Sequence, residues 1–172
     1  MKSMCTAIVL ATLGLTSAGT ASAGDDFLKF SGGIGSTPFA NNIVHGVAAG
    51  GQPWVIRKFR ATISEEGKVS ARGSGLLLGG GNNIGLSGGP RNVLVSLFCN
   101  ADATTTPPTP PTVTHSPAAP LDARGNFSIK GSFSDPVPNP CAAPVLLVRT
   151  VSATTGLPGA WFAAGIPGGD DD

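Results

Sequence analysis

The sequence predicts an all-β protein, a single β-sandwich of the immunoglobulin-like or a related type, with about eight strands tied by one disulfide. Short apolar runs alternate with polar residues at a period of two, and clusters of Gly, Pro, Asn and Asp separate the runs. No segment carries a convincing capped helix. Hydrophobic residues make up 41% of the chain, which favours a folded core despite 25 glycines and 15 prolines.

The first 23 residues have the layout of a signal peptide. Lys2 supplies a positive start, residues 7–15 form an apolar run, and Ala21-Ser22-Ala23 is a cleavage pattern of small residues. The apolar run is too short to span a bilayer. We therefore expect cleavage before Gly24, one domain over residues 24–167, and a secreted, extracellular protein, with the periplasm or the cell surface as other destinations.

Residues 54–75 predict a β-hairpin. Its arms, WVIRKFRATIS and KVSARGSG, flank a three-residue turn that ends in Gly67, and this arrangement sets Ile63 opposite Val69. The apolar positions of the first arm also fit a helical stripe, but the matching second arm favours strands. We interpret three clustered cations of the first arm as a solvated sheet edge, because charge protects exposed strands: Arg57, Lys58 and Arg60.

Seven further runs are typical of strands: residues 27–30, 43–47, 75–78, 93–98, 127–133, 145–151 and 161–166. The segment 103–120 is too rich in Pro and Thr for a central strand, and we expect an extended, solvent-facing loop there. A linker between two small domains is the alternative for this segment. The acidic residues 168–172 are expected to form a flexible tail.

Two cysteines, Cys99 and Cys141, remain after removal of the signal peptide, which contains Cys5. Each borders an apolar run, and a cysteine pair in an exported chain is more often a disulfide than a metal or catalytic pair. The sequence therefore predicts one disulfide between them. Two buried free thiols are the alternative.

The segment GLSGGP, residues 85–90, resembles GDSGGP, the nucleophile motif of trypsin-like serine proteases. Leu86 replaces the acidic residue of that motif, and no Asp lies between His45 and Ser87, although the family needs one there. The same residues also match G-x-S-x-G, with His115 further on, but that motif requires a strand–turn–helix context, whereas Gly-Gly-Pro and a strand follow here. We expect no catalytic residue in this chain.

Metal, cofactor and nucleic-acid sites lack support in the sequence. Its two histidines are far apart, and it contains no metal-ligand spacing and no phosphate-binding glycine motif, so we expect no metal and no cofactor. With Lys2 removed, ten basic and ten acidic residues remain, a formal net charge of zero. This balance argues against binding to nucleic acid, and against binding to a membrane after signal cleavage.

The remaining candidates are binding residues. Trp54 and Trp161 are candidates for a binding platform, although large aromatic residues more often anchor a core. Asn126 begins an N-glycosylation pattern on a predicted turn. We therefore expect a secreted, non-catalytic binding or structural module whose partner is an unidentified extracellular protein or glycan. A small secreted hydrolase and an inhibitor that presents a long loop are the alternatives.

Overall fold

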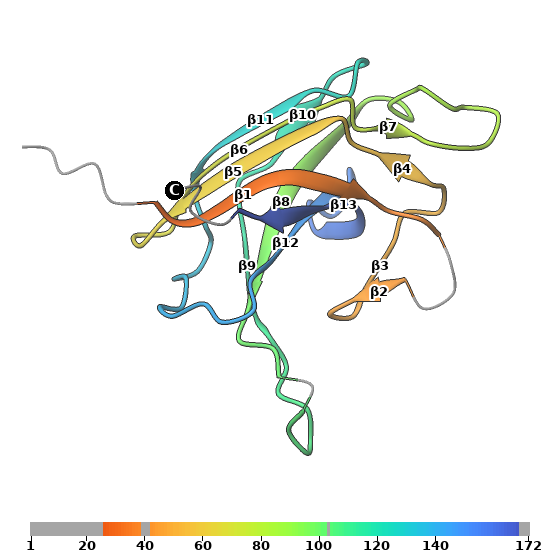
Figure 1. Cartoon of the computed structure of the whole chain (residues 1–172). Helices are drawn as coiled ribbons and strands as arrows, with labels where there is room; N and C mark the ends of the chain where they lie inside the picture. Colours follow the sequence, from red (N-terminus) through yellow and green to blue (C-terminus); the bar gives the residue numbers. More distant parts are fainter. Residues whose placement is uncertain (1–25, 39–41, 103, 169–172) are drawn as a thin grey trace, which may run out of the picture.

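The computed structural model describes residues 26–38, 42–102 and 104–168 (Figure 1). The predicted signal peptide and most of the predicted tail therefore lie outside the described residues. Gly168, the one described residue of the predicted tail, donates its backbone N–H to the carbonyl of Lys29. Within the described ranges the secondary structure is β-strand alone, and no helix is long and apolar enough to cross a membrane. The strands are β1 (Asp26–Gly35), β2 (Ile43–Val44), β3 (Val47–Ala48), β4 (Trp54–Val55), β5 (Lys58–Ser64), β6 (Lys68–Ser74), β7 (Leu77–Leu78), β8 (Arg91–Cys99), β9 (Thr112–His115), β10 (Ala119–Leu121), β11 (Phe127–Ser132), β12 (Val145–Val151) and β13 (Pro158–Pro167).

Eight antiparallel strands form one curled sheet in the order β10-β8-β12-β13-β1-β5-β6-β11, and β9 pairs with β8 beside this path. The two ends of the path, β10 and β11, are consecutive in the chain, and the turn between them brings them side by side (Figure 1). Two small sheets, β2–β3 and β4–β7, lie beside the curled sheet. The all-β prediction is confirmed, whereas the sandwich is not, because the main strands follow one continuous hydrogen-bonded path.

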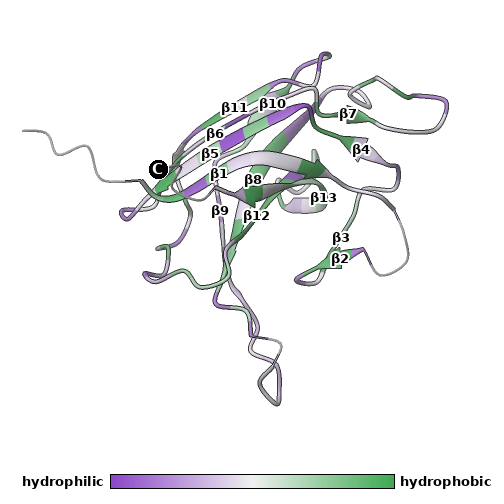
Figure 2. Cartoon of the chain, viewed as in Figure 1, coloured by the Kyte–Doolittle hydropathy of each residue, from purple (hydrophilic) through white to green (hydrophobic). Residues whose placement is uncertain are grey.

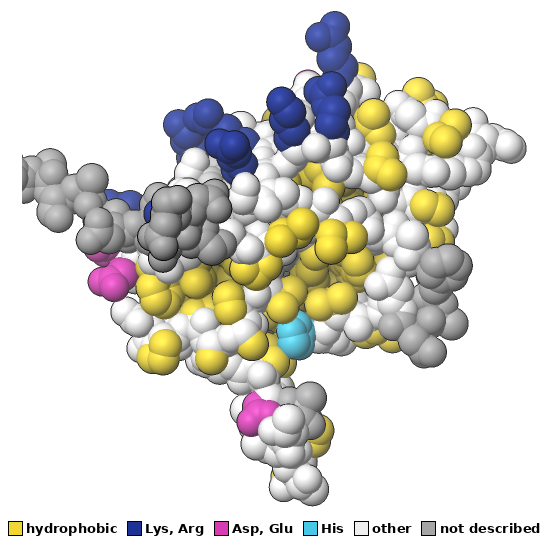
Figure 3. All heavy atoms as spheres, viewed as in Figure 1, with side chains coloured by type: hydrophobic (Ala, Val, Ile, Leu, Met, Phe, Trp, Pro, Cys, Tyr) yellow, Lys and Arg dark blue, Asp and Glu magenta, His cyan; other side chains and the backbone are white. Residues whose placement is uncertain are grey.

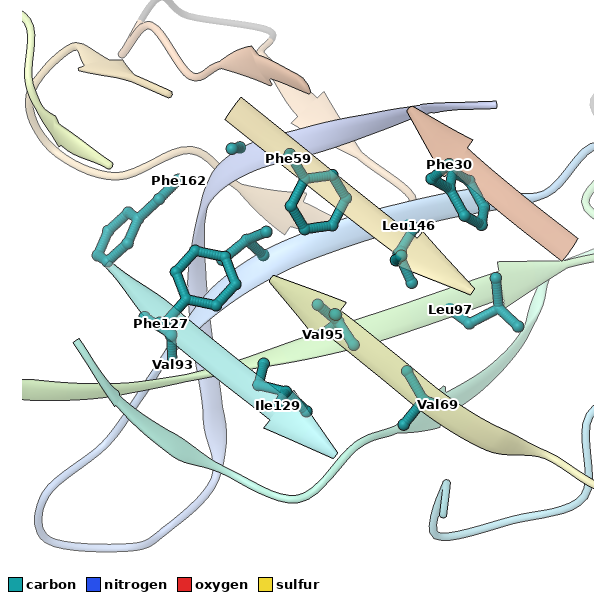
Figure 4. Close-up of a cluster of buried hydrophobic side chains, with 14 of the residues drawn as sticks. Phe30, Phe59, Val69, Val93, Val95, Leu97, Phe127, Ile129, Leu146 and Phe162 are labelled. Carbon is teal, nitrogen blue, oxygen red and sulfur yellow. The ribbon is translucent and has the colours of Figure 1, made fainter. Parts of the chain in front are cut away.

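The main core fills the inside of the curl (Figure 4). Large side chains from six strands meet there, and full burial of one such side chain stabilises the fold by about 1.5–3 kcal/mol; examples are Phe30, Phe59, Val95, Phe127, Leu146 and Phe162. A second, smaller cluster of Phe98, Leu147 and Trp161 lies on the outer face, with Val44 and Val47 of the β2–β3 hairpin packed against it. Residues on both faces of β8 and β12 are therefore buried, which is why these two strands are almost continuously apolar.

The predicted hairpin is confirmed in its register. Ile63 of β5 lies opposite Val69 of β6, and Gly67 has the left-handed φ of 75° that the turn requires. The pairing continues in the same register beyond the predicted end at residue 75, where Trp54 of β4 lies opposite Leu78 of β7. Hydrophilic and hydrophobic residues alternate along β5, as expected for a strand with one buried face (Figure 2).

The interpretation of Arg57, Lys58 and Arg60 as a sheet edge is wrong. The strand β5, which begins at Lys58, lies inside the sheet and pairs with β1 on one side and β6 on the other. Residue alternation along a strand specifies which face each side chain occupies, but it says nothing about which strands lie beside it. The cations therefore mark an outer face rather than an edge.

The Pro- and Thr-rich segment contains two short strands that the sequence did not predict. Both β9 and β10 pair with β8, over its C-terminal and N-terminal halves respectively. Pro120 lies within β10, the strand at one end of the sheet path. Proline has no backbone N–H to donate, and an edge strand can accommodate it because one side of the strand has no partner. The residues 104–111 before β9 form the protruding loop at the bottom of Figure 1 and are the part of the predicted loop 103–120 that precedes these strands.

The predicted disulfide is confirmed between Cys99, the last residue of β8, and Cys141, in the loop before β12. Their sulfur atoms lie 2.01 Å apart, and both residues are buried. A crosslink over 42 residues stabilises a fold by about 4 kcal/mol in the chain-entropy model. Such a bond is typical of a non-reducing, extracellular-type environment.

Candidate functional site

Both tryptophans lie in the protein interior. Trp54 is 4% exposed and stacks on Phe162 with 4.0 Å between ring centroids, and the guanidinium carbon of Arg91 lies 5.3 Å from the Trp54 ring. Trp161 is 5% exposed and donates its indole N–H to the carbonyl of Asn42 over 3.4 Å. Neither ring offers an exposed binding platform, and both act as core anchors.

Asn126 lies on the turn between β10 and β11, as predicted, but its side chain is engaged. The amide nitrogen that would carry a glycan donates to Asp122 Oδ2 over 2.9 Å, and the backbone N–H of Asn126 donates to Asp122 Oδ1 over 2.8 Å. These hydrogen bonds are the main reason why the pKa of Asp122 lies below its ordinary value. The same contacts stabilise the turn and restrain the side chain that would carry a glycan.

Ser87 is buried in the loop between β7 and β8, beside the packing of Trp54 and Arg91. His115, which the G-x-S-x-G pattern would need, lies elsewhere and contacts a different serine. Its Nδ1 is 2.8 Å from Ser96 Oγ, because β9 sets His115 directly opposite Ser96 of β8. Sequence reasoning missed this pair because it depends on the pairing of a strand that was not predicted.

The Ser96–His115 pair has the wrong accessibility for nucleophilic catalysis. Ser96 is fully buried, and Arg149 covers it with a guanidinium nitrogen 3.4 Å from its Oγ. Arg149 also donates to the carbonyls of Gly159 and Pro158 over 2.8 and 3.0 Å. Burial, and then the charge of Arg149, lower the pKa of His115, with a smaller opposing effect from Asp135. The side chains of Ser96, His115 and Arg149 thus link β8, β9, β12 and β13.

Among the described side chains, no group of three or more His, Cys, Asp or Glu residues could hold a metal ion.

Six exposed cations project from the outer face of β1, β5, β6 and β11, which we call the basic face (Figure 3). On each of these strands the cations alternate with inward residues that belong to the main core, such as Phe59, Val69 and Ile129. The basic face consists of Lys29, Lys58, Arg60, Lys68, Arg72 and Lys130.

The strand register arranges the centre of the basic face in two rows. One row runs across four strands as Ser31, Arg60, Arg72 and Ser128, with the two arginines directly opposite each other. The neighbouring row runs as Lys29, Thr62, Ser70 and Lys130. Four cations thus surround a central pair of hydroxyl groups, which is a donor-rich arrangement for oxygen anions.

These cations have no ion-pair partner among the described residues. No described carboxylate lies within 4.0 Å of a Lys or Arg nitrogen, and Figure 3 shows no acidic side chain among the Lys and Arg groups along the upper side of the molecule. Among the described side chains, two carboxylates lie on the β5–β6 turn at one end of the face, where a hydrogen bond from Ser64, and to a smaller extent the charge of Lys68, lower the pKa of Glu66. The sequence did not indicate this face because a net charge of zero reports the sum of the charges and not their distribution.

The surface beside the two arginines is hollowed. A hollow of about 470 Å³ is bordered by four cations and two serine hydroxyls, all of them hydrogen-bond donors: Arg57, Lys58, Arg60, Arg72, Ser31 and Ser74. This is a concave site of positive charge, suited to sulfate, phosphate or carboxylate groups.

Comparisons of this chain with protein-family models, with curated proteins and with solved structures find no match. The function is therefore inferred from the geometry of the basic face.

Proposed function

We propose that the protein is a non-catalytic extracellular binding module that holds an acidic glycan on its basic face. The observation that carries this proposal is the like-charge pair Arg60 and Arg72, placed directly opposite each other without a described carboxylate beside them. Like charges in this position destabilise a sheet. A bound polyanion would relieve the repulsion between the two arginines, and this relief would add to the favourable free energy of binding.

The dimensions of the basic face favour a polymer over a single small anion. Neighbouring strands are about 4.8 Å apart, so the row from β1 to β11 spans roughly 14 Å. Along the strands, the distance from the level of Lys58 to the level of Lys68 is roughly 20 Å at about 3.4 Å per residue. Several consecutive sugar units that carry carboxylate or sulfate groups would contact all six cations, whereas one isolated anion would contact few of them.

The predicted destination of the chain supports a glycan as the ligand. The predicted signal peptide and the disulfide both favour an oxidising compartment outside the cytoplasm, where acidic polysaccharides are exposed. Predicted export is the reason to prefer a glycan over nucleic acid, because the cations of the basic face would attract either polyanion. Ser96 is not accessible as a nucleophile, which favours binding over hydrolysis.

The test is the affinity of the mature chain for heparin, used as a probe acidic polysaccharide, and for neutral dextran. We expect binding to heparin alone, with strong weakening by salt because exposed charges are screened. The double variant Arg60→Gln, Arg72→Gln should bind heparin at least tenfold more weakly, whereas Arg60→Lys, Arg72→Lys should retain most of the affinity. Equal binding of the glutamine variant and the wild type, or equal binding to dextran, would contradict the proposal.

A further inference from the structure

A second hollow adjoins the basic face and differs from it in character. It lies beside the β4–β7 pair and the turn between β10 and β11, and its volume is about 680 Å³. Sites for small molecules commonly enclose roughly 300–1,000 Å³ and combine apolar walls with a few charged groups. This hollow, which we call the apolar hollow, has both properties.

Its walls are aliphatic. Val55, Ile56 and Leu77 line it, and the side chain of Val55 is 50% exposed. Exposed aliphatic side chains gain free energy when a ligand removes them from water, at about 25 cal/mol for each Å² that is buried. The apolar hollow therefore favours a ligand with a hydrocarbon part.

Two arginines, Arg57 and Arg124, also line the apolar hollow. Arg57 also borders the cationic hollow of the basic face, so the two hollows adjoin at this side chain. The carboxylate of Asp122, close to Arg124 in the chain, accepts hydrogen bonds from the backbone N–H groups of Arg124 and Asn126 and from the Asn126 amide. The charge of Arg124 also lowers the pKa of Asp122, so an anionic head group at the border of the hollow would share Arg124 with that carboxylate.

The position of Arg124 is fixed by the backbone and does not depend on a long flexible loop. The N–H of Leu76, a fully buried residue, donates to the carbonyl of Gly125 over 3.0 Å. A β-carbon on Gly125 would lie only 2.5 Å from the carbonyl oxygen of Leu76, so the turn is in close contact with the segment between β6 and β7. This contact holds Arg124 beside Leu77 in the free protein.

We propose that the apolar hollow binds an anionic amphiphile, with its aliphatic chain against Val55, Ile56 and Leu77 and its acidic head group between Arg57 and Arg124. The charge complements the two guanidinium groups, and the chain covers the exposed aliphatic wall. A neutral amphiphile would lack the first interaction and inorganic phosphate would lack the second. This binding uses residues other than the Arg60–Arg72 pair and goes beyond the proposed glycan binding.

Isothermal titration calorimetry with monomeric alkyl phosphates tests the proposal. Decyl phosphate should bind more tightly than octyl phosphate, by up to about fourfold for each added methylene, since burial of one methylene contributes about 0.8 kcal/mol. Decyl maltoside and inorganic phosphate should both bind at least tenfold more weakly than decyl phosphate. Equal affinities for octyl and decyl phosphate would overturn the proposal.

Matched variants locate the site. Val55→Ser should reduce the difference between octyl and decyl phosphate, whereas Val113→Ser, the same change at an exposed position on β9, should leave it unchanged. Arg57→Gln combined with Arg124→Gln should weaken the binding of decyl phosphate about tenfold, because a charge-assisted contact with the head group is lost. The same double variant should leave the binding of decyl maltoside unchanged. Thermal melts show whether each variant is folded, and an equal effect of the two valine changes would contradict the assigned site.

Two further measurements distinguish the apolar hollow from the basic face and from a lipid-binding surface. Arg60→Gln, Arg72→Gln should bind decyl phosphate as the wild type does, so failure of heparin binding and failure of amphiphile binding are distinct results. Binding to vesicles of anionic lipid without binding to monomeric decyl phosphate would overturn the proposal in favour of a membrane surface.

Discussion

Arg60 on β5 and Arg72 on β6 lie directly opposite each other, so two guanidinium groups of equal charge share one face of the sheet. Both are exposed, and their partners across the neighbouring strands are the hydroxyl residues Ser31 and Ser128. A polar, uncharged residue at either position would satisfy the strand pattern equally well. The stability of the sheet therefore does not require this pair, which is why we propose a ligand for it.

Replacement of one arginine should stabilise the free protein. Arg72→Gln removes the cross-strand repulsion, and we expect a gain of up to about 1 kcal/mol at low ionic strength, equivalent to roughly 2–4 °C in Tm for a domain of this size. Calorimetry at low salt and at about 1 M NaCl measures it. The gain should vanish at high salt, where the screening length falls to about 3 Å. A lower Tm at low salt would show that Arg72 stabilises the fold.

The disulfide should contribute strongly to the free energy of unfolding. Cys99→Ser combined with Cys141→Ser removes the crosslink without leaving a free thiol, and we expect a loss of about 2–4 kcal/mol. Urea denaturation of the two proteins measures the loss, and circular dichroism should show the same β signature for both. An unchanged urea midpoint would show that the crosslink has no structural role.

Neither Ser87 nor Ser96 should react as a nucleophile. Ser96 is fully buried beneath Arg149, and Ser87 lies in a glycine-rich loop away from the contact between His115 and Ser96. Incubation with a fluorophosphonate should therefore leave the intact mass unchanged, under conditions that label a known serine hydrolase completely. An adduct on either serine would revive the hydrolase alternative.

His115 should make stability depend on pH near neutrality. Burial lowers its pKa in the folded state below the ordinary value of 6.5, so the unfolded chain binds more protons as the pH falls through that value. Stability should therefore decrease from about pH 7 downwards, until the pH passes the folded pKa. His115→Gln should flatten this dependence between about pH 7 and pH 5, as measured by urea denaturation. An unchanged slope in the variant would assign the dependence to other groups.

The contact between Gly125 and Leu76 should tolerate no side chain. Gly125→Ala combines a left-handed φ of 73° with a clash against the Leu76 backbone. Gly156→Ala is the matched control, since Gly156 has a φ of 70° and no atom within 4 Å of the added carbon. We expect the control to cost about 1–2 kcal/mol and Gly125→Ala about 1–3 kcal/mol more. Equal losses in thermal melts would show that the turn moves easily.

The local parts of the fold were predictable from the sequence. The pairing of Ile63 with Val69 follows from alternation around a turn that ends in glycine, because both signals lie within a few residues of each other. The predicted strand at residues 145–151 coincides with β12. The β9 and β10 strands were missed because their pairing with β8 is non-local, and a proline-rich segment gives no periodic signal for it.

The candidate site was less predictable. Trp54 and Trp161 are core residues, and Asn126 is held by Asp122, so the predicted binding groups are structural. The cations of the basic face come from four strands, and Lys29 and Lys130 are far apart in the sequence. Their assembly depends on the order β1-β5-β6-β11, which alternation does not specify.

The meeting of β10 and β11 also limits how a protein partner could recognise this fold. A peptide that extends a sheet needs a free edge of backbone N–H and C=O groups. At the two ends of the curled sheet β10 and β11 lie side by side without a ladder between them, so each end leaves little room for an incoming strand. Beside β9, Ser134 already accepts from the N–H of His115 and donates its own N–H to the carbonyl of that residue. Backbone pairing with a partner is thus restricted at β9, β10 and β11, which also reduces the risk of edge-to-edge association at these strands.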